Sequence, residues 1–261
     1  MTGLPSAPPA GGSSVKRARP AWALALFGLL ALAGIAGLTA LGIWQLERRV
    51  WKLDLIERVD ARIHASPVPA PGPEAWASVT AASDEYRRVA VTGRFLNDRE
   101  TLVQAVSDLG GGFWVMTPLV TDRGFTVLVN RGFVPPDKRN PATRADGQPH
   151  GQQGGEVTVA GLLRLTEPKG GFLRSNDPAA GRWYSRDVAA IATATGLTDV
   201  APYFIDADGT RNPGGWPVGG LTVVSFPNSH LGYALTWFAL DLMLVGAVLF
   251  VIRSEMRRRR A

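Results

Sequence analysis

The chain has 261 residues, of which 46% are hydrophobic and none is cysteine, and its formal net charge is +6 at pH 7. Without cysteine it can form no disulfide, thiolate copper site, iron–sulfur cluster or covalent haem attachment. Three Lys and Arg residues precede the first apolar stretch and five follow the last, while the region between is formally neutral. Because the charge lies in the two tails, it is no sign of nucleic acid binding, and we expect no nucleic acid partner.

The first apolar stretch, residues 21–44, carries no charged residue and is long enough to cross a bilayer. Basic residues precede it, as they do in a secretory signal peptide. It is longer than the apolar core of a typical signal peptide, however, and residues 42–45 continue into a helical pattern instead of a clear small-residue cleavage site. The sequence therefore predicts an uncleaved transmembrane helix at 21–44, behind a basic tail at 1–20.

The last apolar stretch predicts a second transmembrane helix at 230–252, followed by a basic tail at 253–261. Short basic tails beside apolar spans indicate the cytoplasmic side of a membrane. We therefore expect a multi-pass protein of the cell (cytoplasmic) membrane, with both termini in the cytoplasm and residues 45–229 on the periplasmic or outer side. Membrane lipid is an expected partner, because arginines at the membrane surface attract anionic headgroups.

Residues 45–229 are predicted to form a β-rich exterior domain. Its first part, 45–64, continues the first span as a juxtamembrane helix, because apolar residues recur there at helical spacing. A later segment, 136–155, is rich in Pro, Gly, Gln and charge, which predicts a mobile loop.

The remaining elements of the exterior domain are short. A helix is predicted from Asp187 to Thr195, capped by Ser185 or by Asp187 itself and stopped at Gly196. Seven or so strands are predicted at 86–95, 101–105, 113–120, 125–130, 157–163, 203–206 and 221–226. The fold class is therefore membrane-anchored α+β, with two transmembrane helices flanking a β-rich domain for which a partly closed small barrel is a candidate arrangement.

No catalytic constellation is visible in the sequence. The three histidines, His64, His150 and His230, fall in the juxtamembrane helix, the predicted loop and a membrane border, so none completes a Ser/His/Asp set. No HExxH, Walker or GxGxxG pattern occurs, and nothing places a general acid beside a base. We therefore predict that the protein is not an enzyme.

His230 stands where the second span meets water. Imidazole is a common ligand for metal and haem, so this side chain could serve a cofactor that resides in the membrane. The alternative is an interfacial helix cap, in which Asn228 or Ser229 accepts backbone N–H groups and His230 is merely hydrated beside them. From these residues alone both interpretations stay open.

Asp241 lies near the middle of the second span, where a carboxylate costs about 2.5–3.5 kcal/mol. Eleven residues at about 100° each bring it back to the face of His230, so His230, Tyr233, Trp237 and Asp241 are predicted to form one stripe. Small residues of the first span offer a surface for close helix packing; they are Ala33, Gly34 and Gly37. In the alternative interpretation Trp237 only packs, Tyr233 belongs to an aromatic belt, and Asp241 bonds a backbone carbonyl.

Five sequence motifs, in order, resemble a known family from Trp44 to Trp237. The first is Leu41 to Gln45, followed by Arg48 and Lys52. The others are Val91 to Phe95; Val127 to Pro135; Gly161 to Arg164 with Glu167, Trp183 and Asp187; and Asn228 to Phe238. Together they resemble the surfeit-locus family of cytochrome c oxidase assembly factors, and the chain is identified as a bacterial member. Each motif alone is weak, but five in order between two spans are specific.

This resemblance implies an assembly factor for haem–copper cytochrome c oxidase that binds haem a and assists its insertion into subunit I. Subunit I is then the expected partner, with haem a synthase as a further candidate. Haem a would be held transiently, with His230 as candidate axial ligand of the iron and Tyr233, Trp237 and the small-residue face of the first span covering the macrocycle. Trp44 and Gln45 are further site candidates from the first motif.

The chain departs from the family pattern at two places. Phe133 stands where the family often has Trp, and Ser229 where Asn or Asp is common. Asp241 is not part of the recognised pattern, so its role is inferred from its position alone.

Arg131 is the last candidate. Its guanidinium could pair with a haem propionate or with an acidic patch on the oxidase. Alternatively, Asn130, Arg131 and Gly132 simply end a strand.

Two further functions compete with the haem-handling assembly factor. One is a cofactor-free membrane scaffold that stabilises an oxidase assembly intermediate through its exterior surface. The other is a membrane-tethered exported enzyme unrelated to oxidases, which the missing catalytic constellation disfavours.

Overall fold

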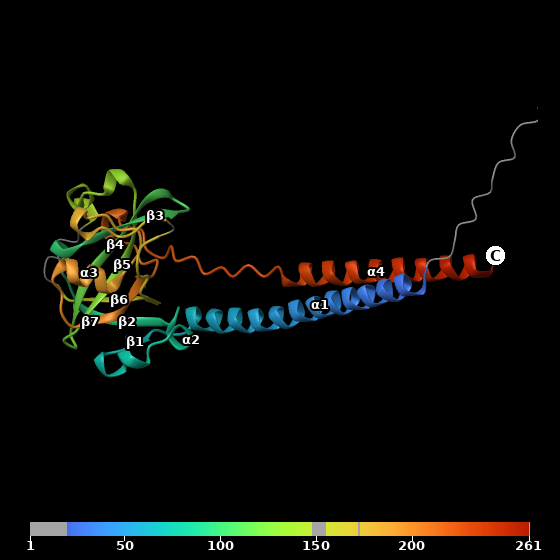
Figure 1. Ribbon diagram of the computed structural model, residues 1–261. Coiled ribbons are helices and arrows are strands. Elements are labelled where there is room, and N and C mark those ends of the chain that lie inside the picture. The colour runs from blue at the N-terminus through green and yellow to red at the C-terminus, as the bar shows by residue number, and fades with distance from the viewer. Residues whose placement is uncertain (1–19, 148–154, 172, 261) are drawn as a thin grey trace, which may run out of the picture. The chain divides into compact units, whose positions relative to one another are not determined.

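The computed structural model describes residues 20–147, 155–171 and 173–260 (Figure 1). These residues divide into two compact units: a helical unit made of residues up to 54 together with 227 onward, and an exterior unit of residues 55–226. The predicted exterior domain, 45–229, is therefore longer at both ends than the compact exterior unit. The two units are described in turn.

Two long helices form the helical unit. Helix α1 runs from Ala21 to His64 and α4 from His230 to Arg260. Both are long and apolar enough to cross a membrane, so the prediction of two spans is confirmed on length and composition and the chain is a membrane protein. The predicted span at 21–44 and the predicted juxtamembrane helix at 45–64 are one uninterrupted helix.

The two helices lie side by side, with small residues of α1 at their contact (Figure 1). At Gly42 an added Cβ would overlap the Phe238 ring, and at Gly34 it would come within 3.0 Å of Leu244. Ala33 and Gly37, by contrast, are exposed. Of the three predicted small residues only Gly34 packs against α4, and a closer contact is at Gly42, about two turns further along α1.

The exterior unit is built on one seven-stranded sheet that closes on itself. Its strands are β1 (Val68–Pro69), β2 (Arg88–Phe95), β3 (Thr101–Ser107), β4 (Gly110–Thr121), β5 (Thr126–Val134), β6 (Val157–Leu165) and β7 (Val200–Ala207). They lie in the order β1-β2-β6-β7-β5-β4-β3, and an additional pairing of β2 with β4 closes a barrel of five strands. The predicted partly closed barrel is thus a closed one.

Closure depends on Gly93, where β2 passes from one neighbour to the other. It pairs with Val157 of β6 and with Thr121 of β4. A Cβ at this position would collide with the β4 backbone, so the strands meet at a residue that has no side chain.

The alternating side chains of β5 and β7 divide the core into two layers. Val127, Val129 and Ile205 point into the barrel, where they belong to its buried apolar interior. Leu128 and Phe204 point the other way and pack with helix α3 (Val188–Thr195). The predicted helix is therefore confirmed; Asp187 caps it by accepting the N–H of Ala190, and Gly196 ends it in a left-handed conformation.

Two other predictions need correction or qualification. Leu221 to Phe226 is not a strand; Thr222 in this segment donates its hydroxyl hydrogen to the side chain of Asp206 at 2.9 Å instead of joining a backbone ladder. The predicted loop at 136–155 contains the 3₁₀ helices Pro136–Lys138 and Pro141–Gly147. Within it the buried Arg144 pairs with Glu100 at 2.6 Å. Its residues 148–154, with His150, lie outside the described residues.

Candidate functional site

His230 is the first residue of α4, and its ring contacts α1. The Nδ1 atom lies 2.8 Å from Oε1 of Gln45, a buried polar side chain. An amide oxygen only accepts hydrogen bonds, so this contact favours the tautomer in which Nδ1 carries the proton. In that tautomer the lone pair is at Nε2, the nitrogen that can bind a metal.

The alternative in which a residue before His230 caps α4 with its side chain is not confirmed for Asn228. Asn228 Oδ1 is buried and has no hydrogen-bond partner among the described residues, so it does not cap α4. The first backbone contact of the helix is instead the N–H of Tyr233, which donates to the backbone oxygen of Ser229 at 3.3 Å.

Two exposed aromatic side chains flank the His230–Gln45 pair. Trp44 precedes Gln45 on α1 and is 52% exposed, and Tyr233, nearly one turn after His230 on α4, is 56% exposed. Both rings are therefore accessible from outside the helix pair. The first span, by contrast, uses Gly34 and Gly42 to pack against α4.

Asp241 also faces α1. Thr39 donates its hydroxyl hydrogen to Asp241 Oδ2 at 2.7 Å, so the partner is a side chain and not a backbone carbonyl. Not every residue of the predicted stripe contacts α1. His230 and Asp241 form hydrogen bonds to α1. The indole nitrogen of Trp237 is buried, but Tyr233 is exposed.

Arg131 belongs to the exterior unit and is only 4% exposed. Its guanidinium lies 4.9 Å from the centre of the Phe95 ring and donates to Asn97 Oδ1 at 3.2 Å. Burial lowers the pKa of Arg131 below its ordinary value, although Glu100 acts to raise it. This arrangement accounts for Arg131 structurally, and a contact with a haem propionate stays a prediction.

The neighbours of Arg131 explain why its motif reads Asn-Arg-Gly. Asn130 Oδ1 accepts the backbone N–H of Gly132 at 3.1 Å. Gly132 has φ +128°, and a Cβ there would collide with the backbone of Val218. The motif therefore holds the end of β5 against the segment that leads towards α4.

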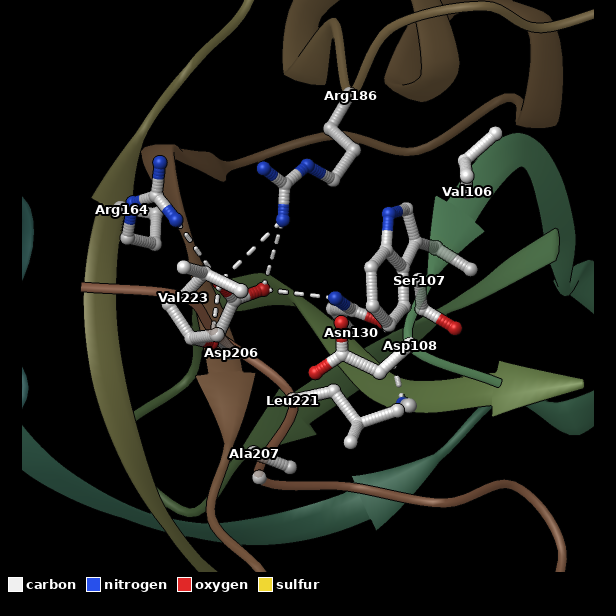
Figure 2. Close-up of a pocket in the computed structure, with 14 residues that line it drawn as sticks. Val106, Ser107, Asp108, Asn130, Arg164, Arg186, Asp206, Ala207, Leu221 and Val223 are labelled. Carbon is white, nitrogen blue, oxygen red and sulfur yellow. Dashed lines mark hydrogen bonds and ion pairs between the residues drawn. The ribbon is translucent and has the colours of Figure 1, made fainter. Parts of the chain in front are cut away.

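A buried carboxylate in the exterior unit was not predicted from the sequence. Asp206, at the end of β7, is 3% exposed and accepts hydrogen bonds from four side chains, as Figure 2 shows for three of them. We call the group the Asp206 cluster; its distances to Asp206 oxygens are 2.8 Å from Asn130, 3.1 Å from Arg164, 3.0 Å from Arg186 and 2.9 Å from Thr222.

Two more carboxylates balance the arginines of this cluster. Glu85 accepts from Arg164 at 2.7 Å, and Glu167 accepts from Arg186 at 3.1 Å. Burial alone would lower the pKa of Arg164, but Asp206 and Glu85 outweigh it and raise that pKa above its ordinary value. Burial would likewise raise the pKa of Glu167, but Arg186 lowers it below the usual range. The cluster is thus a set of mutually stabilised charges.

The Asp206 cluster lines one side of a pocket of about 610 Å³. Val106 and Val223 are among its other lining residues and are exposed (Figure 2). Asn130, Arg164 and Glu167 all lie in the family motifs, so the sequence did mark these residues. That they gather around Asp206 follows only from the folding of the barrel. Among the described residues no group of three or more His, Cys, Asp or Glu side chains could hold a metal ion.

Comparison with known proteins places the chain in a family. Residues 32–242 match the SURF1 family. Surfeit locus protein 1 of Rattus norvegicus is 41% identical over 216 residues, which are 77% of this chain and 67% of that protein. The Homo sapiens protein of the same name is 41% identical over 218 residues, 77% of this chain and 69% of that protein.

The alignment with a more distant relative covers a larger share of both chains. The SURF1-like protein of Monosiga brevicollis is 35% identical over 227 residues, which are 82% of this chain and 83% of that protein. The resemblance found in the sequence motifs is confirmed over most of the chain, and the protein belongs to the SURF1 family.

Proposed function

We propose that this protein is a membrane-anchored assembly factor for haem–copper cytochrome c oxidase, which binds haem a and assists its insertion into subunit I. Family membership supports the role in oxidase assembly. The observation that carries the haem proposal is the contact of His230 Nδ1 with Gln45, because it leaves Nε2 free to bind iron.

The residues around His230 fit a haem. A flat apolar ligand needs exposed aromatic or aliphatic faces near the iron ligand, and Trp44 and Tyr233 provide them. Haem supplies the iron to which an imidazole nitrogen binds. A single protein ligand at the helix surface also suits a factor that must release its cargo.

The proposed setting is the cell membrane, with both termini in the cytoplasm and the exterior unit on the periplasmic side. The four arginines at the end of α4, Arg257 to Arg260, support this orientation because basic residues flank spans on the cytoplasmic side. They would also contact anionic lipid. Subunit I and haem a synthase are the proposed protein partners, and no enzymatic activity is proposed.

An absorption spectrum tests the proposal. The full-length protein is purified in mild detergent from cells that make haem a, and we expect the spectrum of bound haem a together with co-purifying subunit I. A colourless preparation from cells with ample haem a, with subunit I still present, would instead support the cofactor-free scaffold. Absence of both would contradict any role in oxidase assembly.

Gln45→Leu is expected to weaken haem binding without abolishing it. The substitution removes the acceptor that orients His230 and keeps the proton on Nδ1, and loss of such an orienting partner lowers metal affinity about 10–100-fold. The measurement is a haem titration of the purified protein. Gln45→Glu, which retains an acceptor, should bind more tightly than Gln45→Leu; equal affinity of the two variants would contradict the orienting role.

A further inference from the structure

The pocket of about 610 Å³ in the exterior unit lies between the hairpin of β3 and β4 and the segment that follows β7. Val106 and Asp108 belong to the hairpin, and Leu221 and Val223 belong to the segment (Figure 2). Val106 is 87% exposed and Val223 is 71% exposed. A pocket of this size accommodates a drug-sized ligand or a few residues of a peptide. Its exposed apolar residues favour a ligand that has apolar parts of its own.

Strand β3, which borders the pocket, is also an edge of the sheet. Gln104 donates its backbone N–H away from β4, to the backbone oxygen of Trp183 at 2.8 Å. In an antiparallel pair the residue two positions further along points its backbone groups the same way, so the N–H and C=O of Val106 point away from β4. Among the described residues neither group has a backbone partner. An edge of this kind can accept one more strand.

The charges around the pocket do not balance. The two arginines of the Asp206 cluster line it, but they are already paired with Asp206, Glu85 and Glu167. Asp108 also lines the pocket, is exposed, and has no ion pair within the part of the chain that the structure describes. Two arginines therefore accompany four carboxylates, and the group has a formal charge of −2. This excess favours a cationic side chain and disfavours an acidic one.

We propose that the pocket and the β3 edge bind an extended segment of a partner protein, which places a lysine or arginine side chain in the pocket. The backbone of the segment pairs with Val106, and its basic side chain approaches Asp108. Residues two positions before and after the basic one lie on the same face of a strand, so apolar side chains there contact Val106 and Val223. The proposal concerns a protein partner and is independent of haem binding.

A library of random heptapeptides displayed on phage tests the chemistry of this partner. The full-length protein in mild detergent is the bait, and binding of the most enriched peptide is then measured by fluorescence anisotropy. We expect enriched peptides to carry a lysine or arginine with apolar residues two positions away. Replacing that basic residue by glutamate should abolish binding, and added salt should weaken binding because it screens the attraction.

Two variants test the two parts of the site with the enriched peptide. Val106→Pro removes an N–H that points away from β4, so the β3–β4 ladder is kept while strand addition is blocked, and binding should be lost. Asp108→Lys reverses a charge at the pocket and should weaken binding about tenfold. Asp122→Lys is the matched control, because Asp122 is also an exposed residue directly after a strand but is not among the described residues that line the pocket. Its affinity should equal that of wild type.

Four outcomes would overturn the proposal. Enrichment of acidic peptides, or of no peptide, would contradict a basic partner segment. Equal affinities of Asp108→Lys and Asp122→Lys would remove Asp108 from the site, and unchanged binding to Val106→Pro would exclude strand addition. If light scattering shows a wild-type dimer that Val106→Pro converts to a monomer, the β3 edge pairs with a second copy of this chain instead of a partner segment.

Discussion

His230→Ala is expected to yield a protein that inserts into the membrane and folds normally but carries no haem a. The substitution removes the only imidazole of the helical unit and with it the proposed iron ligand. The fold should tolerate the change, because the helix contacts at Gly42 and Phe238 and between Thr39 and Asp241 remain. What is lost structurally is one hydrogen bond, and the buried amide of Gln45 is left without that partner, at a cost of about 1–3 kcal/mol.

The measurement is the absorption spectrum of the variant beside that of wild type, with circular dichroism to check helix content. His64→Ala is a matched control, because it also removes an imidazole, but this one is at the end of α1, where its side chain is 72% exposed and contacts Asp60 of its own helix. It should keep the full haem spectrum. Undiminished haem in His230→Ala would remove His230 as ligand, and loss of haem from both variants would indicate a nonspecific effect of purification.

The spans and most of the strands could be predicted because their signals are local. An uncharged stretch of 24 residues at 21–44 has few alternatives to a membrane helix. A short apolar run such as Val127, Leu128 and Val129, bounded by turn residues, is typical of a buried strand. The segment 221–226 is also rich in apolar and β-branched residues but is not a strand, because strand formation needs a pairing partner, which a local pattern does not specify.

The candidate site was predictable in its parts but not in its contacts. Helical periodicity placed His230 and Asp241 on one face, and both do bond α1. Their partners, Gln45 and Thr39, depend on the register of the two helices, because the bonded residues are 185 and 202 positions apart in sequence. Tyr233, which was predicted to lie on the same face, is 56% exposed. The Asp206 cluster was missed for the same reason, since its members come from β5, β6, β7 and two connecting segments.

Asp206→Ala is expected to destabilise the exterior barrel by about 3–5 kcal/mol, the usual cost of removing one partner from a buried ion pair. Asp206 is 3% exposed and holds both Arg164 and Arg186, whose side chains are themselves largely buried. Without it, Glu85 and Glu167 remain as partners, but each arginine loses its best-buried counter-charge. Asn130 and Thr222 also lose their acceptor, so the tie between β5, β7 and the segment leading to α4 is broken.

Hydrogen exchange of the β5 and β7 backbone amides in the full-length protein measures this effect, because exchange from core strands reports the free energy of opening. Glu74→Ala is the control: Glu74 pairs with Arg123 at 3.0 Å, but its side chain is 70% exposed, and such pairs contribute about 0–1 kcal/mol. If the β5 and β7 amides of Asp206→Ala exchanged as slowly as those of Glu74→Ala, the Asp206 cluster would not stabilise the barrel. Its charged side chains would then serve the pocket that they line.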